Sequence, residues 1–81
     1  MPDKKSILIT GAGRGIGRAI ALSQAKPGVT LFINYLRDDA SAEKVKQEAS
    51  QKGANVFLVP ANLADADEIK RLFSEIKKHA V

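Results

Sequence analysis

The chain has 81 residues, of which 44% are hydrophobic, and its 13 basic and nine acidic side chains give a net charge of +4. This length permits one small domain, and the hydrophobic content is typical of a folded protein rather than a disordered one. No apolar stretch approaches the roughly 18 residues of a membrane span. The absence of cysteine and the single histidine exclude disulfides, thiol nucleophiles and Cys- or His-rich metal sites. We therefore expect a cytoplasmic protein that has no membrane partner and binds no metal.

The basic excess lies mainly in the first 40 residues, which also contain a cluster of glycines. Nucleic-acid-binding proteins usually carry a dense basic stripe, often with aromatic side chains that stack on bases. Here the basic residues occur at most in pairs, and the chain has one tyrosine, three phenylalanines and no tryptophan. We interpret the excess as complementary to a small anionic ligand and predict no nucleic-acid partner.

Three short apolar segments alternate with three helical patterns along the chain. The predicted strands cover residues 7–10, 30–35 and 56–59, and the predicted helices cover residues 16–26, 40–52 and 66–80. Pro27 and Gly28 favour the end of the first helix, and Pro60 favours the end of the third strand. Asp65 and Glu68 stand three residues apart, which is the spacing of a capping box at the start of the last helix.

The strands are continuously apolar rather than alternating, which indicates a parallel sheet buried on both faces. The last helix carries a single apolar stripe, at Ile69, Leu72, Phe73 and Ile76. Three β-α units with right-handed crossovers predict an α/β fold of the Rossmann type, βαβαβα. We expect a three-stranded parallel sheet of order 3-2-1, half of a doubly wound fold. The first two helices should lie on one face and the third on the other.

Two pairs of opposite charges have the spacing i,i+4 on predicted helices. Glu48 stands before Lys52, and Asp67 stands before Arg71. In this order such pairs stabilise a helix on its exposed face. We therefore expect both ion pairs to form within their helices.

Four of the six glycines lie in Gly11-Ala12-Gly13-Arg14-Gly15-Ile16-Gly17, directly after the first strand and opening the first helix. Glycine lets the backbone approach a pyrophosphate, and the free N–H groups of the helix N-terminus bind it. A P-loop and the common Gly-x-Gly-x-x-Gly spacing both require glycine at Ile16, so neither fits. The pattern that fits is Gly11-x-x-x-Gly15-x-Gly17, preceded by Thr10.

This loop and its continuation to Ala21 resemble the cofactor loop of the short-chain dehydrogenase/reductase family, particularly its 3-oxoacyl-carrier-protein reductase-like branch. Two later segments resemble those after the family's second and third strands, namely Asn34-Tyr35-Leu36-Arg37 and Ala61-Asn62-Leu63-Ala64-Asp65. The resemblance implies an oxidoreductase that transfers hydride between a nicotinamide cofactor and a carbonyl or alcohol substrate. Residues 1–81 would form the N-terminal part of its single NAD(P)-binding Rossmann domain.

The resemblance implies cofactor contacts in three segments, which are Thr10, Gly11, Ala12, Gly13, Arg14, Gly15, Ile16 and Gly17, then Tyr35, Leu36 and Arg37, and finally Ala61, Asn62 and Leu63. The glycines would form the turn after the first strand, let the backbone approach the pyrophosphate closely, and let the first helix pack on the sheet. Thr10 would tie the loop together or serve as an ordinary strand residue. Ile16 would be a core residue or a wall of the cofactor cleft. Asn62 would contact the adenine ring or serve only the turn after Pro60.

The end of the second strand decides between the two nicotinamide cofactors. NAD-binding proteins place an acidic residue there for the ribose hydroxyls, whereas NADP-binding proteins place positive charge for the 2′-phosphate. The chain has no acidic residue at Asn34, Tyr35 or Leu36, and Arg37 follows. With Arg14 as a second cation, we predict a preference for NADP(H), with NAD(H) as the alternative. The competing interpretation of Arg37 is an exposed arginine paired with one of the two following aspartates.

The family's catalytic Tyr-x-x-x-Lys is absent, because the only tyrosine, Tyr35, is followed four residues later by Asp39. We therefore expect no catalytic residue and no dehydrogenase activity in the 81 residues alone. We also expect marginal stability and self-association through an open edge at the first strand. The intact protein should be a homo-oligomer.

Two other functions stay open from the residues. One is a non-catalytic nucleotide-binding or dimerising module. The other, more distant, is an S-adenosylmethionine site of the methyltransferase type, because Gly11-x-Gly13-x-Gly15 matches its glycine core. In such sites an acidic residue stands two positions before the first glycine of this core. In this chain Ile9 stands at that position.

Overall fold

The sheet consists of three parallel strands, as the sequence predicts. The computed structural model describes residues 4–11 and 15–80. Strands β1 (Lys5–Thr10), β2 (Val29–Tyr35) and β3 (Asn55–Pro60) lie in the order β1-β2-β3, which is the predicted order counted from the other edge. The register aligns Thr10 with Asn34 and Asn34 with Val59. The carboxyl ends of all three strands therefore lie at one end of the sheet.

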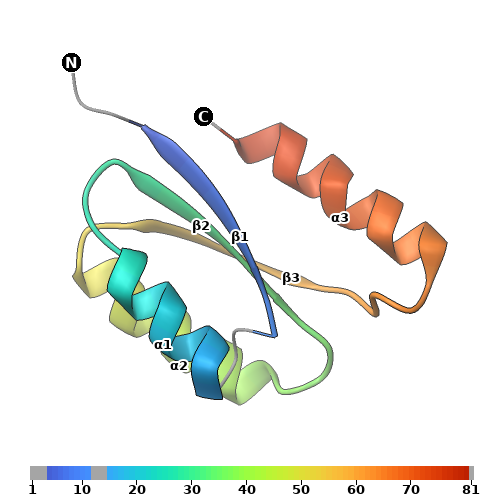
Figure 1. Ribbon diagram of the computed structural model, residues 1–81, viewed down its shortest axis with the longest axis horizontal. Helices are drawn as coiled ribbons and strands as arrows, with labels where there is room; N and C mark the ends of the chain where they lie inside the picture. The colour runs from blue at the N-terminus through green and yellow to red at the C-terminus, as the bar shows by residue number, and fades with distance from the viewer. Residues whose placement is uncertain (1–3, 12–14, 81) are drawn as a thin grey trace.

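The three helices cover the two faces of the sheet unequally. Helices α1 (Gly15–Gln24) and α2 (Asp39–Gln51) pack side by side on one face, and α3 (Ala66–His79) lies on the opposite face (Figure 1). Each helix connects one strand to the next or follows the last strand. This arrangement confirms the predicted βαβαβα half of a doubly wound fold.

The central strand β2 is the most deeply buried element. Every residue from Val29 to Asn34 is buried, because β2 has a strand on each side and helices on both faces. In β1 only Ile9 is buried, and in β3 only Val56 and Val59 are. The expectation that strands are buried on both faces is confirmed for β2 and is wrong for β1 and β3, since each has only one neighbouring strand among the described residues.

Successive side chains of β2 point to opposite faces, as the pleat of a strand requires. Leu31 and Ile33 point to the face covered by α1 and α2, whereas Phe32 points to α3. The cluster on the α1/α2 face is the larger one. It contains Ile9, Ala21, Ala25, Val29, Leu31, Ile33, Val45, Ala49, Ala54 and Val56.

The cluster on the α3 face is smaller and more open. Its buried members are Phe32, Val59, Ala61 and Leu72. Of the apolar stripe predicted for this helix, only Leu72 is buried. Phe73 is 51% exposed, and the remaining two residues of the stripe are half-buried.

Two element ends differ from the prediction. Strand β3 includes Pro60, which has no N–H to donate but is tolerated at the end of a strand that pairs on one side only. Helix α1 ends at Gln24, two residues before the predicted end and three before Pro27. In the described residues, no helix is long and apolar enough to cross a membrane.

The predicted i,i+4 ion pairs do not form. Glu48 accepts two hydrogen bonds from Nη2 of Arg18, each at 2.7 Å, and one from its Nε at 3.2 Å. This contact joins α1 to α2, so the carboxylate is not free for Lys52. Arg71 pairs with Glu68 at 3.6 Å instead of Asp67. The first pair joins residues 30 apart, which no spacing within a helix reveals, whereas the second uses i,i+3 in place of the predicted i,i+4 spacing.

Candidate functional site

The carboxyl ends of the strands bring the three predicted segments to the same end of the sheet. Thr10 ends β1, Tyr35 ends β2 and Pro60 ends β3, and each following connection leaves the sheet there. Ligands of open α/β sheets bind at this end. The candidate site is therefore the end of the sheet from which the glycine loop, residues 35–37 and residues 61–65 extend.

The two described glycines that flank the glycine loop adopt a left-handed backbone. The φ angle is +63° at Gly11 and +64° at Gly15, a conformation that residues with a side chain rarely adopt. A Cβ at either position would meet no atom of residues 4–11 and 15–80 within 4 Å, its chain neighbours aside. The space next to these glycines is therefore left open by the protein, at the N-terminus of α1, where free N–H groups favour an anion.

The predicted loop segment also includes Ala12, Gly13, Arg14, Ile16 and Gly17. Ala12, Gly13 and Arg14 lie outside the described residues. Ile16 is 81% exposed, so its predicted role as a core residue is wrong, and its role as a wall of the cofactor cleft stays a prediction. Gly17 is half-buried in the same turn of the helix.

The segment after β2 exposes its apolar and its basic side chain. Leu36 is 55% exposed, and Arg37 is exposed as well. Arg37 takes part in none of the ion pairs among residues 4–11 and 15–80. The carboxylate of Asp38 instead caps α2, where it accepts hydrogen bonds from the backbone N–H of Ser41 at 3.0 Å and from its hydroxyl at 2.7 Å. Arg37 is thus an exposed residue next to the site, outside the ion pairs of the described residues.

Tyr35 does not have the electrostatics of a catalytic tyrosine. Burial raises the pKa of its phenol above the ordinary value of 10.0, and the carboxylates of Asp39 and Glu43 raise it further. A phenol that transfers a proton near neutral pH requires a lowered pKa. Tyr35 therefore remains protonated and lines the end of β2 without acid–base chemistry.

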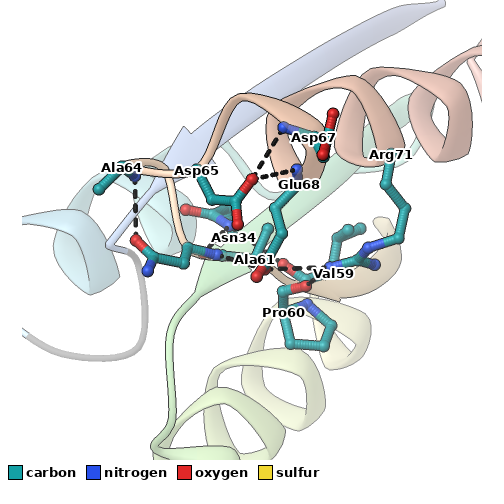
Figure 2. Close-up of polar contacts among 10 residues, drawn as sticks. Asn34, Val59, Pro60, Ala61, Ala64, Asp65, Asp67, Glu68 and Arg71 are labelled. Atoms are coloured by element: carbon teal, nitrogen blue, oxygen red, sulfur yellow. Dashed lines mark hydrogen bonds and ion pairs between the residues drawn. The ribbon is translucent and has the colours of Figure 1, made fainter.

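A buried asparagine joins the carboxyl ends of β2 and β3 (Figure 2). Asn34 is 3% exposed, and its amide nitrogen donates to the carbonyl of Val59 at 3.2 Å and to that of Ala61 at 3.3 Å. The backbone N–H of Ala61 donates to the carbonyl of Tyr35 at 2.9 Å. The start of the β3–α3 connection is therefore fixed to β2 by both main-chain and side-chain hydrogen bonds.

Asn62 forms a tight turn directly after this junction. Its side-chain oxygen accepts from the backbone N–H of Ala64 at 2.9 Å, and its carbonyl accepts from the N–H of Asp65 at 3.1 Å. An asparagine that bonds a backbone N–H two residues on makes an Asx turn. Asn62 therefore serves the turn after Pro60, while its contact with an adenine ring stays a prediction, and Leu63 within the turn is 40% exposed.

The start of α3 differs from the predicted capping box in one partner. Asp65 is the N-cap, and its Oδ1 accepts from the backbone N–H groups of Asp67 at 2.9 Å and Glu68 at 3.4 Å (Figure 2). The carboxylate of Glu68, however, accepts from the backbone N–H of Asn62 at 2.8 Å and not from that of Asp65. The helix cap thereby holds the turn at Asn62.

Sequence analysis missed three residues that hold this turn. Asn34 entered the sequence argument through the family resemblance and as a non-acidic residue at the end of the second strand, and no contact with the turn was expected of Asn34, Glu68 or Arg71. Arg71 also donates to the carbonyl of Pro60 (Figure 2). A signal for Asn34 was present, because a polar side chain at a buried strand position must find hydrogen-bond partners. No spacing rule identifies the other two.

A cavity of about 220 Å³ lies elsewhere, between β3 and α3. Its floor contains Phe57, whose ring stacks on His79 with centroids 4.2 Å apart. None of the predicted site residues lines it. Across the described part of the chain, no group of three or more His, Cys, Asp or Glu side chains could hold a metal ion.

Comparison with known sequences identifies relatives of this fold and loop. Residues 5–80 match the family model described as short chain dehydrogenase. A 3-oxoacyl-acyl-carrier-protein reductase, FabG, of Staphylococcus aureus is 47% identical over 76 residues, which are 94% of this chain and 31% of that protein. A hydroxynaphthalene reductase-like protein, Arp2, of Metarhizium brunneum is 41% identical over 75 residues, or 93% of this chain and 28% of that protein. The chain thus spans about a third of the length of these relatives.

Solved structures agree in fold over the same part. The angucycline C-6 ketoreductase LanV with bound NADP superposes with a TM-score of 0.79 at 31% identity, covering 94% of this chain and 31% of that one. A short-chain dehydrogenase/reductase of Serratia marcescens gives a TM-score of 0.85 at 27% identity, covering 95% and 31%. The match of the family model over nearly the whole chain, together with the parallel sheet and the glycine loop at its carboxyl end, means that the chain belongs to the short-chain dehydrogenase family.

Proposed function

We propose that this chain is the NADP(H)-binding portion of an oxidoreductase that acts on a carbonyl or alcohol substrate. Residues 1–81 would be the N-terminal part of a single NAD(P)-binding Rossmann domain. The observation that carries the proposal is the strand–loop–helix unit at the start of the chain. There the backbone of Gly11 and Gly15 leaves open space at the N-terminus of α1.

The pyrophosphate of the cofactor would bind over this loop. The N–H groups of the first turn of α1 have no helical acceptor, so an anion would satisfy them, and the helix dipole favours its charge. Gly11 and Gly15 have a left-handed backbone that a larger residue would strain, and Gly17 follows them in the first turn of α1. Thr10 directly precedes the loop, because it is the last residue of β1, where it pairs with Asn34 of β2.

Arg37 would bind the 2′-phosphate that distinguishes NADP(H) from NAD(H). Its exposure at the end of β2, without an ion pair among the described residues, supports this role. A guanidinium also presents two parallel N–H groups to a phosphate. Arg14 in the loop would contribute a second positive charge, and Tyr35 and Leu36 would flank the ribose.

The adenine ring would lie against the turn after β3. Ala61, Asn62 and Leu63 lie at the carboxyl end of the sheet, and Asn62 and Leu63 are both exposed. An exposed carboxamide can donate and accept hydrogen bonds at the edge of a base. Leu63 provides apolar surface for the face of the ring.

The cofactor supplies the hydride when bound, and the proton donor of the reaction would come from outside these 81 residues. Tyr35 is unsuitable because its pKa is raised and not lowered. The names of the relatives as reductases support a carbonyl substrate. The 81 residues alone should therefore bind cofactor without turning over a carbonyl compound.

The test is charge reversal at the position proposed to contact the 2′-phosphate. Arg37→Glu should raise the Kd for NADPH about 10- to 100-fold, because a hydrogen bond to a charged group contributes roughly 1.5–3 kcal/mol. The Kd for NADH should change little. Titration of cofactor fluorescence measures both constants.

Lys46→Glu provides the matched control, because it makes the same charge change on an exposed position of α2. It should leave both constants nearly unchanged. An equal loss of affinity for NADPH and NADH in Arg37→Glu would contradict the proposal that Arg37 binds the 2′-phosphate. A wild-type protein that binds neither dinucleotide would contradict the proposed function as a whole.

A further inference from the structure

We propose that Asn34 is a positioning residue for the adenine end of the cofactor, an inference that rests on the proposed function. The side chain is 3% exposed, so it would act without touching the cofactor. Its carboxamide fixes the turn that begins at Ala61 relative to the sheet. The adenine-binding residues Asn62 and Leu63 would take their position from that turn.

The orientation of the carboxamide follows from its partners. Both groups that it meets, at Val59 and Ala61, are backbone carbonyls, which accept but do not donate. Only the amide nitrogen, with its two hydrogens, can satisfy both. Asn34 thus uses both of its donors in one place, and no other neutral side chain of that size offers two donors on one atom.

The second of these bonds gives the carbonyl of Ala61 a partner at the point where the pairing of β2 with β3 ends. The main-chain pairing of β2 with β3 ends at the bond from the N–H of Ala61 to the carbonyl of Tyr35. Ala61 is 5% exposed, so its own carbonyl would be buried without a partner where the chain turns away. The amide of Asn34 provides that partner, and its loss would leave a buried acceptor unsatisfied.

Asn34 also lies between the two halves of the proposed cofactor site. Its backbone pairs with Thr10, which precedes the glycine loop, on one side and with Val59 on the other. The remaining contacts of the turn run to α3, through Glu68 to the N–H of Asn62 and through Arg71 to the carbonyl of Pro60. Asn34 is therefore the side chain that sets the turn relative to the sheet and the pyrophosphate loop.

A turn held in one position can distinguish bases that differ in hydrogen bonding. Adenine carries a 6-amino donor and an N1 acceptor, whereas hypoxanthine carries a 6-oxo acceptor and an N1–H donor. A fixed polar group rejects the wrong pattern because a desolvated group is then left unpaired. A turn that can shift adapts to either base and loses this preference.

The experiment compares the Kd of NADPH with that of its hypoxanthine analogue in three proteins. The wild type should bind NADPH about tenfold more tightly than the analogue, the effect of roughly one hydrogen bond. Asn34→Leu keeps the size of the side chain but removes both donors. It should bring the ratio of the two Kd values close to one, mainly by weakening the binding of NADPH. Asn34→Ser keeps one donor and should give an intermediate ratio, and it remains testable where the leucine variant does not fold.

The matched control is Thr30→Val, on the same strand and the same face but at the far end of β2, with Thr30 also 3% exposed. A purely structural effect would weaken both ligands by the same factor, as we expect for this control. An unchanged ratio in both Asn34 variants would overturn the inference, as would a wild type that binds both dinucleotides equally well. A wild type that binds neither would instead refute the proposed function.

Discussion

The two faces of the sheet are stabilised in different ways. On the α1/α2 face, apolar side chains from both helices and all three strands form one closed cluster in which Leu31, Ile33 and Val45 are 0% exposed. On the α3 face the buried cluster is small, Phe73 is 51% exposed, and residues of β3 and α3 line a cavity of about 220 Å³. One central strand thus supports a packed layer and a loose one.

The difference extends to the candidate cofactor site. The glycine loop leads into α1, whose position is set by apolar packing on the closed face. The turn at Asn62 leads into α3, and its position is set by hydrogen bonds that Asn34 and Arg71 donate and by one that Glu68 accepts. We infer that the pyrophosphate end of the site depends on core packing, whereas the adenine end depends on a few polar contacts.

The largest expected difference concerns isoleucine truncation on the two faces. Ile33→Ala should lower the free energy of unfolding by about 2–5 kcal/mol, because it leaves a cavity in a closed cluster. Ile76→Ala, on the half-buried side of α3, should cost under about 2 kcal/mol, because part of its side chain is already in water. Urea denaturation followed by circular dichroism measures both. Similar losses at the two positions would show that the α3 face is packed as tightly as the other.

Most of this comparison could be predicted from the sequence. The apolar runs and helical periods identified all six elements, and the right-handed crossover rule placed the helices on their faces. The periodicity could not reveal how well each face closes. Burial of β1 and β3 depends on neighbours in space, and the stripe on α3 has the same spacing whether Phe73 is covered or exposed.

The second expected difference concerns the ion pairs on the two faces. Arg18 and Glu48 join two helices through several hydrogen bonds, with side chains 41% and 38% exposed. Lys78 and Glu75 lie within α3, with one contact at 3.4 Å and the lysine 66% exposed. Double-mutant cycles with alanine should give a coupling of about 0.5–1 kcal/mol for the first pair and about 0.2–0.5 kcal/mol for the second.

Salt provides the check on these couplings. Both pairs are partly exposed, so both coupling energies should fall as the ionic strength rises. The interhelical pair should retain the larger share, because its several hydrogen bonds do not depend on charge attraction alone. A coupling for Arg18 and Glu48 no larger than that within α3 would mean that apolar packing alone joins α1 to α2.

The charged and polar contacts were the least predictable part of the molecule. Local spacing assigned Glu48 to Lys52, whereas the structure pairs it with Arg18, 30 residues away in sequence. The contacts of Asn34 likewise cross 25 and 27 residues. The hydrogen-bond partner of a long side chain depends on which groups lie near it in the folded protein. A spacing rule within one helix contains no information about groups on other elements. The need for glycine at Gly11 and Gly15 was predictable, because the backbone conformation of a turn is a local property.

The smallest expected effect is a pH dependence of the free energy of unfolding that arises from a tyrosine on the α1/α2 face. The odd-numbered residues of β2 point to α1 and α2, and Tyr35 is the last of them, next to Asp39 and Glu43 at the start of α2. Burial first, and then these carboxylates, raise the pKa of its phenol above 10.0 in the folded protein. The folded state therefore holds this proton more tightly than the unfolded state. The resulting stabilisation is complete below about pH 10 and is lost as the pH rises through the folded-state pKa.

Tyr35→Phe removes this ionisation and isolates its contribution from that of the lysines. The difference in the free energy of unfolding between wild type and Tyr35→Phe should be constant up to about pH 9 and should then turn against the wild type as the pH rises past about 10. Asp39→Asn should shift the onset of this loss toward that of a free phenol, because it removes one of the charges that hold the proton in place. Urea denaturation at a series of alkaline pH values measures all three proteins. If this difference in the free energy of unfolding does not change with pH, the pKa of Tyr35 is the same in the folded and unfolded states. The start of α2 would then not pack against Tyr35, and the closely packed cluster would end before the carboxyl end of β2.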